Sequence, residues 1–192
     1  MRFFIPPRVK LRTREEGQKQ MKILIAFYSK TGNTKAVAEA IFNALQEEDK
    51  VLAPIKEIED IDDFALIFCG FPVYAHSVPV PVHGFLKKIK GNQKLALFST
   101  HGARTEGRMQ KEAIEHAIGL AKNAELLGYF TCRGQVEQAV LDNLMTKPEH
   151  RAWAMEAASA HAHPDKADLE DAQVFARGVL KKALKFKEFN KK

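Results

Sequence analysis

The stretch ILIAFYSKTGNT, residues 23–34, contains in order an apolar run, a polar loop with one glycine, and the start of a helix pattern. The apolar run covers residues 23–28, which is typical of a strand buried on both faces of a sheet. Val37, Ile41 and Leu45 follow at intervals of four residues, which places them on one face of a helix. A buried strand that leads through a short loop into a helix predicts the opening unit of an α/β domain.

The same alternation continues along the chain. Four further apolar runs predict strands, at 51–55, 64–70, 95–98 and 126–130. Pro54 suits an edge strand, because proline has no N–H group to donate to a neighbouring strand. Helix patterns separate the later runs. Five strands that alternate with helices predict a single doubly wound parallel sheet.

Residues 135–167 do not belong to this minimal plan. They predict a helical insertion of two short helices, around 136–145 and 149–159, and they contain Trp153, the only tryptophan. An insertion of this length is commonly a lid or a contact surface. The last helix is expected to follow it and to begin at a cap formed by Asp168.

Composition excludes several classes of protein. The chain has 192 residues, of which 45% are hydrophobic and 28% charged, as in one soluble globular domain. No apolar run approaches the roughly 20 residues that span a bilayer, so we expect no membrane protein. Two cysteines are too few for a disulfide-stapled secreted scaffold. We therefore expect a cytoplasmic protein.

The net charge of +6 is unevenly distributed. Residues 1–20 carry +4 and residues 181–192 carry +5, which leaves −3 for residues 21–180. No basic patch interleaved with aromatic residues lies between the two ends, so we expect no nucleic-acid partner. The lysines of 181–192 are interpreted as a solvated helix end, with docking to an acidic partner as the alternative.

Residues 1–20 show neither strand nor helix periodicity and include Pro6 and Pro7. They also lack the apolar core of a signal peptide. Two interpretations stay open: a disordered extension, or a misassigned start with Met21 as the natural first residue. In both, the folded domain is expected to cover residues 21–188.

The loop after the first strand is the first place to look for chemistry, because doubly wound sheets bind ligands at the carboxyl ends of their strands. It offers the hydroxyl groups of Ser29, Thr31 and Thr34, beside a run of backbone N–H groups at the start of a helix. These groups suit a phosphate dianion. The loop has neither the glycine pattern of a Walker A loop nor that of a dinucleotide-binding turn.

This loop resembles the Ser/Thr-x-Thr-Gly-x-Thr phosphate loop of flavodoxins, which hold the phosphate of FMN in this way. Residues 63–74 look like the third strand and first flavin-contacting loop of that family, and residues 98–102 look like the fourth strand and second flavin loop. The resemblance covers residues 21–134 and the last helix. It implies the strand order 2-1-3-4-5 and FMN as a noncovalently bound cofactor.

The resemblance also implies which residues contact FMN. The phosphate would lie against Ser29, Lys30, Thr31, Gly32, Asn33 and Thr34. The isoalloxazine ring would lie between two loops, made of Pro72, Val73, Tyr74, Ala75, His76 and Ser77, and of Thr100, His101, Gly102, Ala103 and Arg104. Tyr74 is the first choice for stacking on the ring, with His76 or His101 on the other side. No catalytic side chain and no metal are required, since the flavin carries the electrons.

Two features depart from an acidic electron-carrying flavodoxin. His76, His101 and Arg104 place cationic groups in the flavin loops, and residues 72–77 contain no glycine. Both favour, modestly, a reductase. The predicted function is an FMN-binding electron-transfer protein with a redox partner protein. The alternatives are an FMN-dependent oxidoreductase that reduces a quinone or other small acceptor, and a flavin-less binding module. A homodimer is left open.

Other conspicuous residues have simpler interpretations. Cys69 lies inside a buried strand and is expected to be structural, while Cys132, at a strand end, is not paired with it in a redox motif. His150, His161 and His163 are interpreted as a polar loop before a helix cap rather than a metal site.

Overall fold

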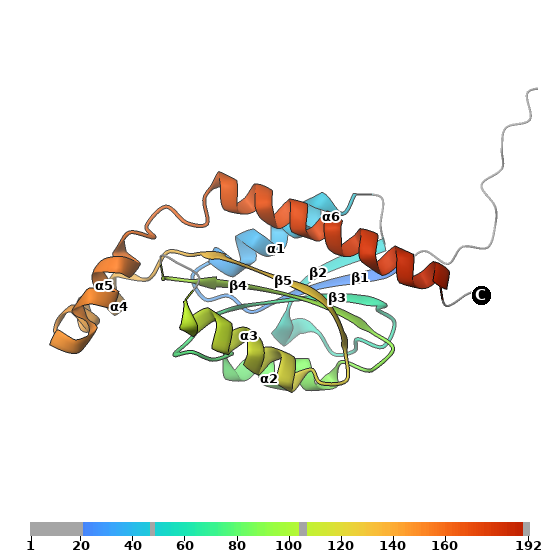
Figure 1. Ribbon diagram of the computed structural model, residues 1–192, viewed down its shortest axis with the longest axis horizontal. Helices are drawn as coiled ribbons and strands as arrows, with labels where there is room; N and C mark the ends of the chain where they lie inside the picture. Colours follow the sequence, from blue (N-terminus) through green and yellow to red (C-terminus); the bar gives the residue numbers. More distant parts are fainter. Residues whose placement is uncertain (1–20, 47–48, 104–106, 190–192) are drawn as a thin grey trace, which may run out of the picture.

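The computed structural model describes residues 21–46, 49–103 and 107–189, and within them a parallel sheet lies between two layers of helices (Figure 1). The strands run in the order β2-β1-β3-β4-β5, and every neighbouring pair is parallel. The predicted topology is therefore confirmed. The strands are β1 (Lys22–Phe27), β2 (Asp49–Pro54), β3 (Leu66–Pro72), β4 (Lys94–His101) and β5 (Glu125–Arg133).

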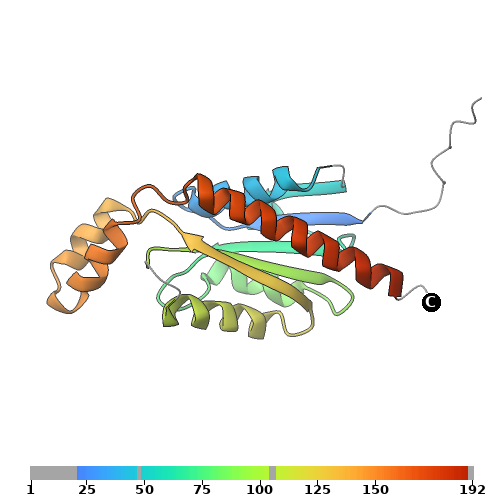
Figure 2. The same ribbon diagram turned by 45° about the horizontal axis from the view of Figure 1, so that its top comes forward.

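Helices cover both faces of the sheet (Figures 1 and 2). On one face α1 (Asn33–Ala44) and α6 (Lys166–Phe189) pack over the first of two apolar clusters, which includes the α6 residues Ala172, Ala176, Val179 and Ala183. On the other face α2 (Val80–Lys88) and α3 (Arg108–Leu120) pack over the second. Alternate residues of each central strand enter opposite clusters, which explains why these strands are apolar throughout.

The connection from β2 to β3 is unusually brief. Only a single 3₁₀ turn, η1 (Ile55–Glu57), lies where a doubly wound fold would place a covering helix. β2 is an edge strand, as Pro54 predicts, and most of its side chains are exposed or half-buried. The sheet beside β1 and β2 is consequently covered on one side by fewer elements than the rest.

The predicted insertion is helical. It contains α4 (Gln138–Met145), the turn η2 (Pro148–His150) and α5 (Arg151–Ala158), and it extends from the carboxyl end of the sheet (Figures 1 and 2). The strand before it, β5, is longer than the predicted 126–130 and contains an irregularity opposite residues 95 and 96 of β4.

The expected cap of the last helix is wrong by three residues. α6 begins at Lys166, so Asp165 occupies the cap position and Asp168 lies in the first turn. Each aspartate accepts a hydrogen bond from the backbone N–H group of the other, at 2.9 Å and 3.0 Å. This reciprocal pair is a capping box, in which both side chains satisfy N–H groups that the helix leaves unpaired.

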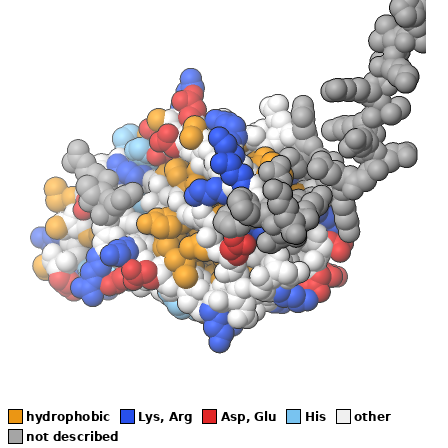
Figure 3. Space-filling model, turned by 45° about the vertical axis from the view of Figure 1, so that its right-hand side comes forward, with side chains coloured by type: hydrophobic (Ala, Val, Ile, Leu, Met, Phe, Trp, Pro, Cys, Tyr) orange, Lys and Arg blue, Asp and Glu red, His pale blue; other side chains and the backbone are white. Residues whose placement is uncertain are grey.

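No helix among the described residues is long and apolar enough to cross a membrane. On the face shown in Figure 3, lysine and arginine side chains are interspersed with acidic ones. The predictions for residues 1–20 and for Arg104 lie outside the described residues.

Candidate functional site

The three loops singled out from the sequence meet at the carboxyl edge of the sheet. The Val73 N–H group donates to the Thr100 carbonyl at 2.9 Å, and the hydroxyl groups of Thr34 and Thr100 lie 2.9 Å apart. The Lys30 ammonium group lies 5.7 Å from the centre of the Tyr74 ring. One direct contact therefore joins each pair of loops.

The phosphate-type loop has the backbone that an anion site needs. Gly32 adopts a left-handed conformation, with φ of 95°, and directs the chain into α1. Its N–H group donates to Ser29 Oγ at 3.1 Å. The first turn of α1 contains no acidic residue, and its first N–H groups have no partners within the helix. The helix dipole adds positive potential at the same point.

The side chains of this loop divide into two groups. Ser29 Oγ and Thr31 Oγ1 each accept one hydrogen bond and keep their own proton to donate. The Thr34 hydroxyl is buried against Thr100, and the Asn33 amide donates to the Gln135 carbonyl at 2.7 Å. Ser29 and Thr31 are therefore the hydroxyl donors free to face an anion, while Asn33 and Thr34 tie the loop to its surroundings.

Residues 74–77 form a tight two-residue turn. The N–H and carbonyl groups of Tyr74 and Ser77 pair reciprocally at 3.1 Å and 2.8 Å. Ala75 and His76, between them, both have positive φ, of 44° and 64°. Such turns usually contain glycine, asparagine or aspartate there, because other residues pay roughly 1–2 kcal/mol for this conformation. The absence of glycine has not prevented the turn.

Side chains from α3 hold this turn. His76 Nδ1 lies 2.8 Å from Glu112 Oε2, and Arg108 Nε donates to the other oxygen of Glu112 at 2.5 Å. The hydrogen bond from Arg108, helped by His76, lowers the pKa of Glu112 below its ordinary value. Ser77 Oγ lies 2.8 Å from His116 Nδ1. Sequence reasoning missed Glu112 and His116, which lie far along the chain within an ordinary amphipathic helix.

Of the three rings predicted to flank a flavin, Tyr74 and His76 are exposed and His101 is buried. Tyr74 is 40% exposed, and partial burial raises the pKa of its hydroxyl, as do Tyr28 and Glu137. The His76 side chain is held by Glu112, and His101 is buried at the end of β4. Tyr74 is therefore the exposed ring at this edge that is not engaged by a carboxylate and can face a flat ligand.

The insertion packs directly on the loop after β4. A Cβ atom at Gly102 would lie 2.6 Å from a methyl group of Val136 and 3.3 Å from Ala157, so only glycine fits. Trp153 lies next to the same position, and its Nε1 atom is buried without a hydrogen-bond partner among the described residues. This contact explains why the isolated Gly102 follows β4, which sequence reasoning could not.

Arg133, at the end of β5, fastens the insertion to that loop. Its guanidinium group donates to the Ala103 carbonyl at 3.2 Å, to the Glu156 carbonyl at 3.2 Å and to Ser159 Oγ at 2.8 Å. One side chain therefore connects the predicted flavin loop with the end of α5. With the bond from Asn33 to Gln135, it makes the insertion a wall of the site.

The remaining candidates have structural environments. Burial raises the pKa of both thiols, Cys69 and Cys132, so both stay protonated at neutral pH. His163 has donor atoms close to those of Asp165 and Asp168, but these two carboxylates form the capping box of α6 and His163 Nδ1 lies 2.5 Å from Asp168.

Comparison with known proteins assigns the family. A family model described as a flavodoxin domain matches residues 24–177. The flavodoxin-like domain-containing protein BilS of Clostridioides difficile (strain CD3) is 30% identical over 175 residues, which cover 85% of this chain and 98% of that protein. An uncharacterized protein of Methanocaldococcus jannaschii is 28% identical over 167 residues, which cover 84% of this chain and 99% of that protein.

Solved structures share the fold at low sequence identity. A flavodoxin from the domain Archaea aligns with a TM-score of 0.57 and 16% identity, over 85% of this chain and 99% of that one. A short-chain flavodoxin associated with a non-canonical PDU bacterial microcompartment aligns with a TM-score of 0.60 and 14% identity, over the same shares. The family model and the BilS relative each span most of the sequence, and the chain therefore belongs to the flavodoxin family.

Proposed function

We propose that this protein binds FMN at the carboxyl edge of its sheet and transfers electrons to and from a redox partner protein in the cytoplasm. The observation that carries the proposal is the convergence of the anion-type loop 29–34, the Tyr74 turn and the end of β4 at one place. Membership of the flavodoxin family supports the same conclusion. The two buried, unpaired cysteines suit a reducing compartment.

The residues at this edge fit the parts of FMN. The N–H groups at the start of α1, with the hydroxyls of Ser29 and Thr31, would hold the phosphate. Tyr74 would stack on the isoalloxazine ring, and backbone groups of 72–77 and 100–103 would contact its edge. FMN, when bound, supplies the electron-accepting chemistry. The chain orients it and sets the charges around it.

The test compares FMN with riboflavin, the same flavin without the phosphate. Because two charge-assisted hydrogen bonds to the phosphate contribute about 3 kcal/mol or more, riboflavin should bind at least about a hundredfold more weakly. Each flavin is titrated with the purified protein, and the quenching of flavin fluorescence gives the two dissociation constants. Equal affinities would remove the phosphate loop from the proposal. Failure of FMN to bind would favour the flavin-less binding module.

An FMN-dependent oxidoreductase acting on a quinone or other small acceptor is the second candidate. The observation that favours it is the insertion, which packs against the loop after β4 and so adds a wall that could receive a substrate. Redox titration distinguishes the two. Two separate one-electron steps support the electron carrier, and a single two-electron step with turnover of NAD(P)H and quinone supports the enzyme.

A further inference from the structure

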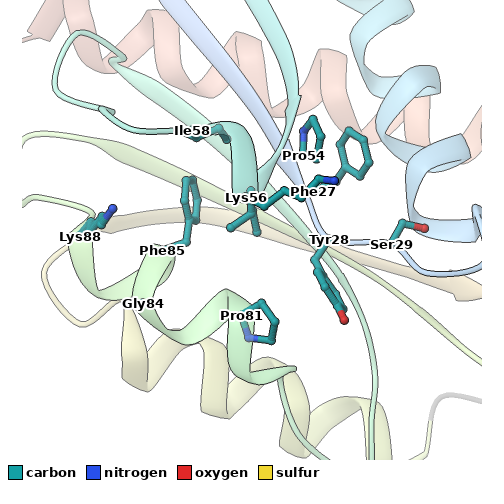
Figure 4. A pocket seen from close by; sticks show the side chains of 11 residues that line it. Phe27, Tyr28, Ser29, Pro54, Lys56, Ile58, Pro81, Gly84, Phe85 and Lys88 are labelled. Carbon is teal, nitrogen blue, oxygen red and sulfur yellow. The ribbon is translucent and has the colours of Figure 1, made fainter.

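We propose that the protein has a second ligand site, separate from the flavin loops, which binds a flat aromatic molecule with an anionic substituent. The site is a cavity of about 640 Å³ between α2 and the ends of β1 and β2 (Figure 4). This volume lies within the range of pockets that hold small organic ligands. The proposal does not depend on FMN binding.

The cavity exists because the crossover from β2 to β3 is so short. η1 takes the place of a covering helix, and the hollow beside it is lined by the half-buried Tyr28 and Ile58 and by the edges of the buried Ile55 and Phe85. Figure 4 shows Phe85 of α2 on one side and Tyr28, at the end of β1, on the other, while the Phe27 ring belongs to the apolar cluster on the opposite face of the sheet. Aromatic walls on two sides favour a flat apolar ligand.

The charges of the cavity are of one sign. Among the described residues that line it, the charged ones are Lys56 and Lys88, and none is acidic. Lys56 has a loose contact with Glu57, at 3.9 Å between exposed side chains, and Lys88 forms no ion pair with a described residue. Two ammonium groups beside an apolar surface would bind a carboxylate, sulfonate or phosphate attached to the aromatic part of the ligand.

Gly84 is the position at which a single substitution can fill the cavity. It lies in the middle of α2, where glycine is less favourable than any residue except proline. A Cβ atom there would meet nothing within 4 Å, so packing does not demand glycine. The position lines the cavity, and its missing side chain keeps the space open. A large side chain at this position would therefore occupy the cavity without displacing a neighbouring atom.

The cavity and the flavin loops share a boundary but not their groups. Ser29 belongs to both, yet its hydroxyl points toward α1 in Figure 4 and accepts the Gly32 N–H group. None of residues 72–77 or 100–103 lines the cavity. A ligand here would therefore leave the Tyr74 turn free.

Anilinonaphthalene sulfonate, an aromatic anion that fluoresces in apolar surroundings, is the probe. We expect saturable binding of one equivalent to the folded protein. Gly84→Leu should weaken it about tenfold or more by filling the cavity, and the double variant Lys56→Gln, Lys88→Gln should weaken it roughly threefold to tenfold. Gly119→Leu is the matched control, because its Cβ would also meet open space, in α3 away from the cavity, and it should leave binding unchanged.

Phenylnaphthylamine, the same molecule without the sulfonate, tests the charge. The double lysine variant should leave its binding unchanged, while Gly84→Leu should weaken it. Saturating FMN should not displace the sulfonate probe, and the protein without FMN should bind the probe equally well. Probe binding can therefore succeed or fail independently of FMN binding. Absence of probe binding, insensitivity to Gly84→Leu, or displacement by FMN would each overturn the proposal. The double lysine variant alters only exposed side chains. Its effect on binding of the sulfonate probe can therefore still be measured if Gly84→Leu fails to fold.

Discussion

At the scale of single residues, Glu112 and Gly102 determine how the two predicted flavin loops are held in place. Glu112 accepts hydrogen bonds from Arg108 and His76, and so holds a turn whose two central residues have positive φ. Gly102 lets the insertion lie against the end of β4. Neither residue is assigned a chemical role. Substitution of either one should therefore change the stability of the fold and the geometry of the nearby loop.

Glu112→Gln should make the free energy of unfolding less dependent on pH in the acidic range. The pKa of Glu112 is lower in the folded protein than its ordinary 4.5, so the carboxylate stabilises the fold above about pH 4.5 and loses that contribution as pH falls through the lowered value. The wild type should therefore be the more stable protein at neutral pH, and the difference between the two should shrink as pH falls through the lowered pKa of Glu112. Thermal unfolding of both from pH 7 to pH 3 measures this. A constant difference would contradict it.

Gly102→Ala should destabilise the protein by about 1–3 kcal/mol, because the new methyl group overlaps Val136 and must push the insertion away. Gly119→Ala is the control, because the new Cβ would meet nothing within 4 Å. Since alanine is the better helix former, this variant should raise the free energy of unfolding by up to about 1 kcal/mol. Urea unfolding of both variants gives the two free energies. Equal effects would mean that the insertion does not depend on a close approach at residue 102.

At the scale of elements, the helices and strands follow from patterns along the chain, and the contacts between them do not. The apolar run 23–28 and the spacing of Val37, Ile41 and Leu45 predict β1 and α1, because burial imposes a period on each element. The sequence predicts the cap of α6 at Asp168, three residues too late, because Asp165 has the same side chain and occupies the cap position instead.

The candidate site divides in the same way. The loops 29–34, 72–77 and 100–103 are predictable, because the carboxyl ends of neighbouring parallel strands always lie together. The bond from Asn33 to Gln135 and the pair of His76 with Glu112 are not, because each joins residues far apart in sequence through side chains whose direction depends on packing. The cavity beneath η1 has no pattern in the sequence at all, since it results from a missing helix.

Arg133→Gln should loosen α4 and α5 while leaving the sheet intact. Arg133 donates to Ala103 at the sheet edge and to Glu156 and Ser159 at the end of α5, so its loss removes the polar fastening of the insertion. Hydrogen exchange in residues 138–158 should become at least about tenfold faster, corresponding to about 1.4 kcal/mol of local stability. Arg177→Gln, an exposed residue of α6, is the control and should leave that exchange unchanged.

At the scale of the whole molecule, the excess positive charge belongs to the ends of the chain rather than to the site. Within α6, Lys182 donates to the Leu127 carbonyl of β5, so one lysine of the basic end has a structural contact. The carboxyl edge of the sheet, where the predicted flavin loops meet, is bordered by the insertion. If the protein exchanges electrons with a partner protein as proposed, that partner would approach this edge and contact the insertion together with the exposed part of Tyr74.

FMN should stabilise the entire fold if it binds as proposed. A ligand present at about a hundredfold excess over its dissociation constant adds about 2.7 kcal/mol to the free energy of unfolding. For a domain of this size, that amount raises the midpoint of thermal unfolding by roughly 5–10 °C. Thermal unfolding with and without FMN measures the shift, and riboflavin at the same concentration should give a much smaller one. An unchanged midpoint would contradict FMN binding.

The amide of Asn33 gives this arrangement a thermodynamic property of its own. It connects the anion loop to the backbone of Gln135, from which α4 and α5 continue, so the two segments share one bond at 2.7 Å. If the docking of another protein displaces Gln135, it changes the affinity of the loop for its anion by some factor. Linkage then requires the anion to change the affinity for that protein by the same factor. Binding of the anion and binding of the protein would then be thermodynamically coupled across the edge of the sheet.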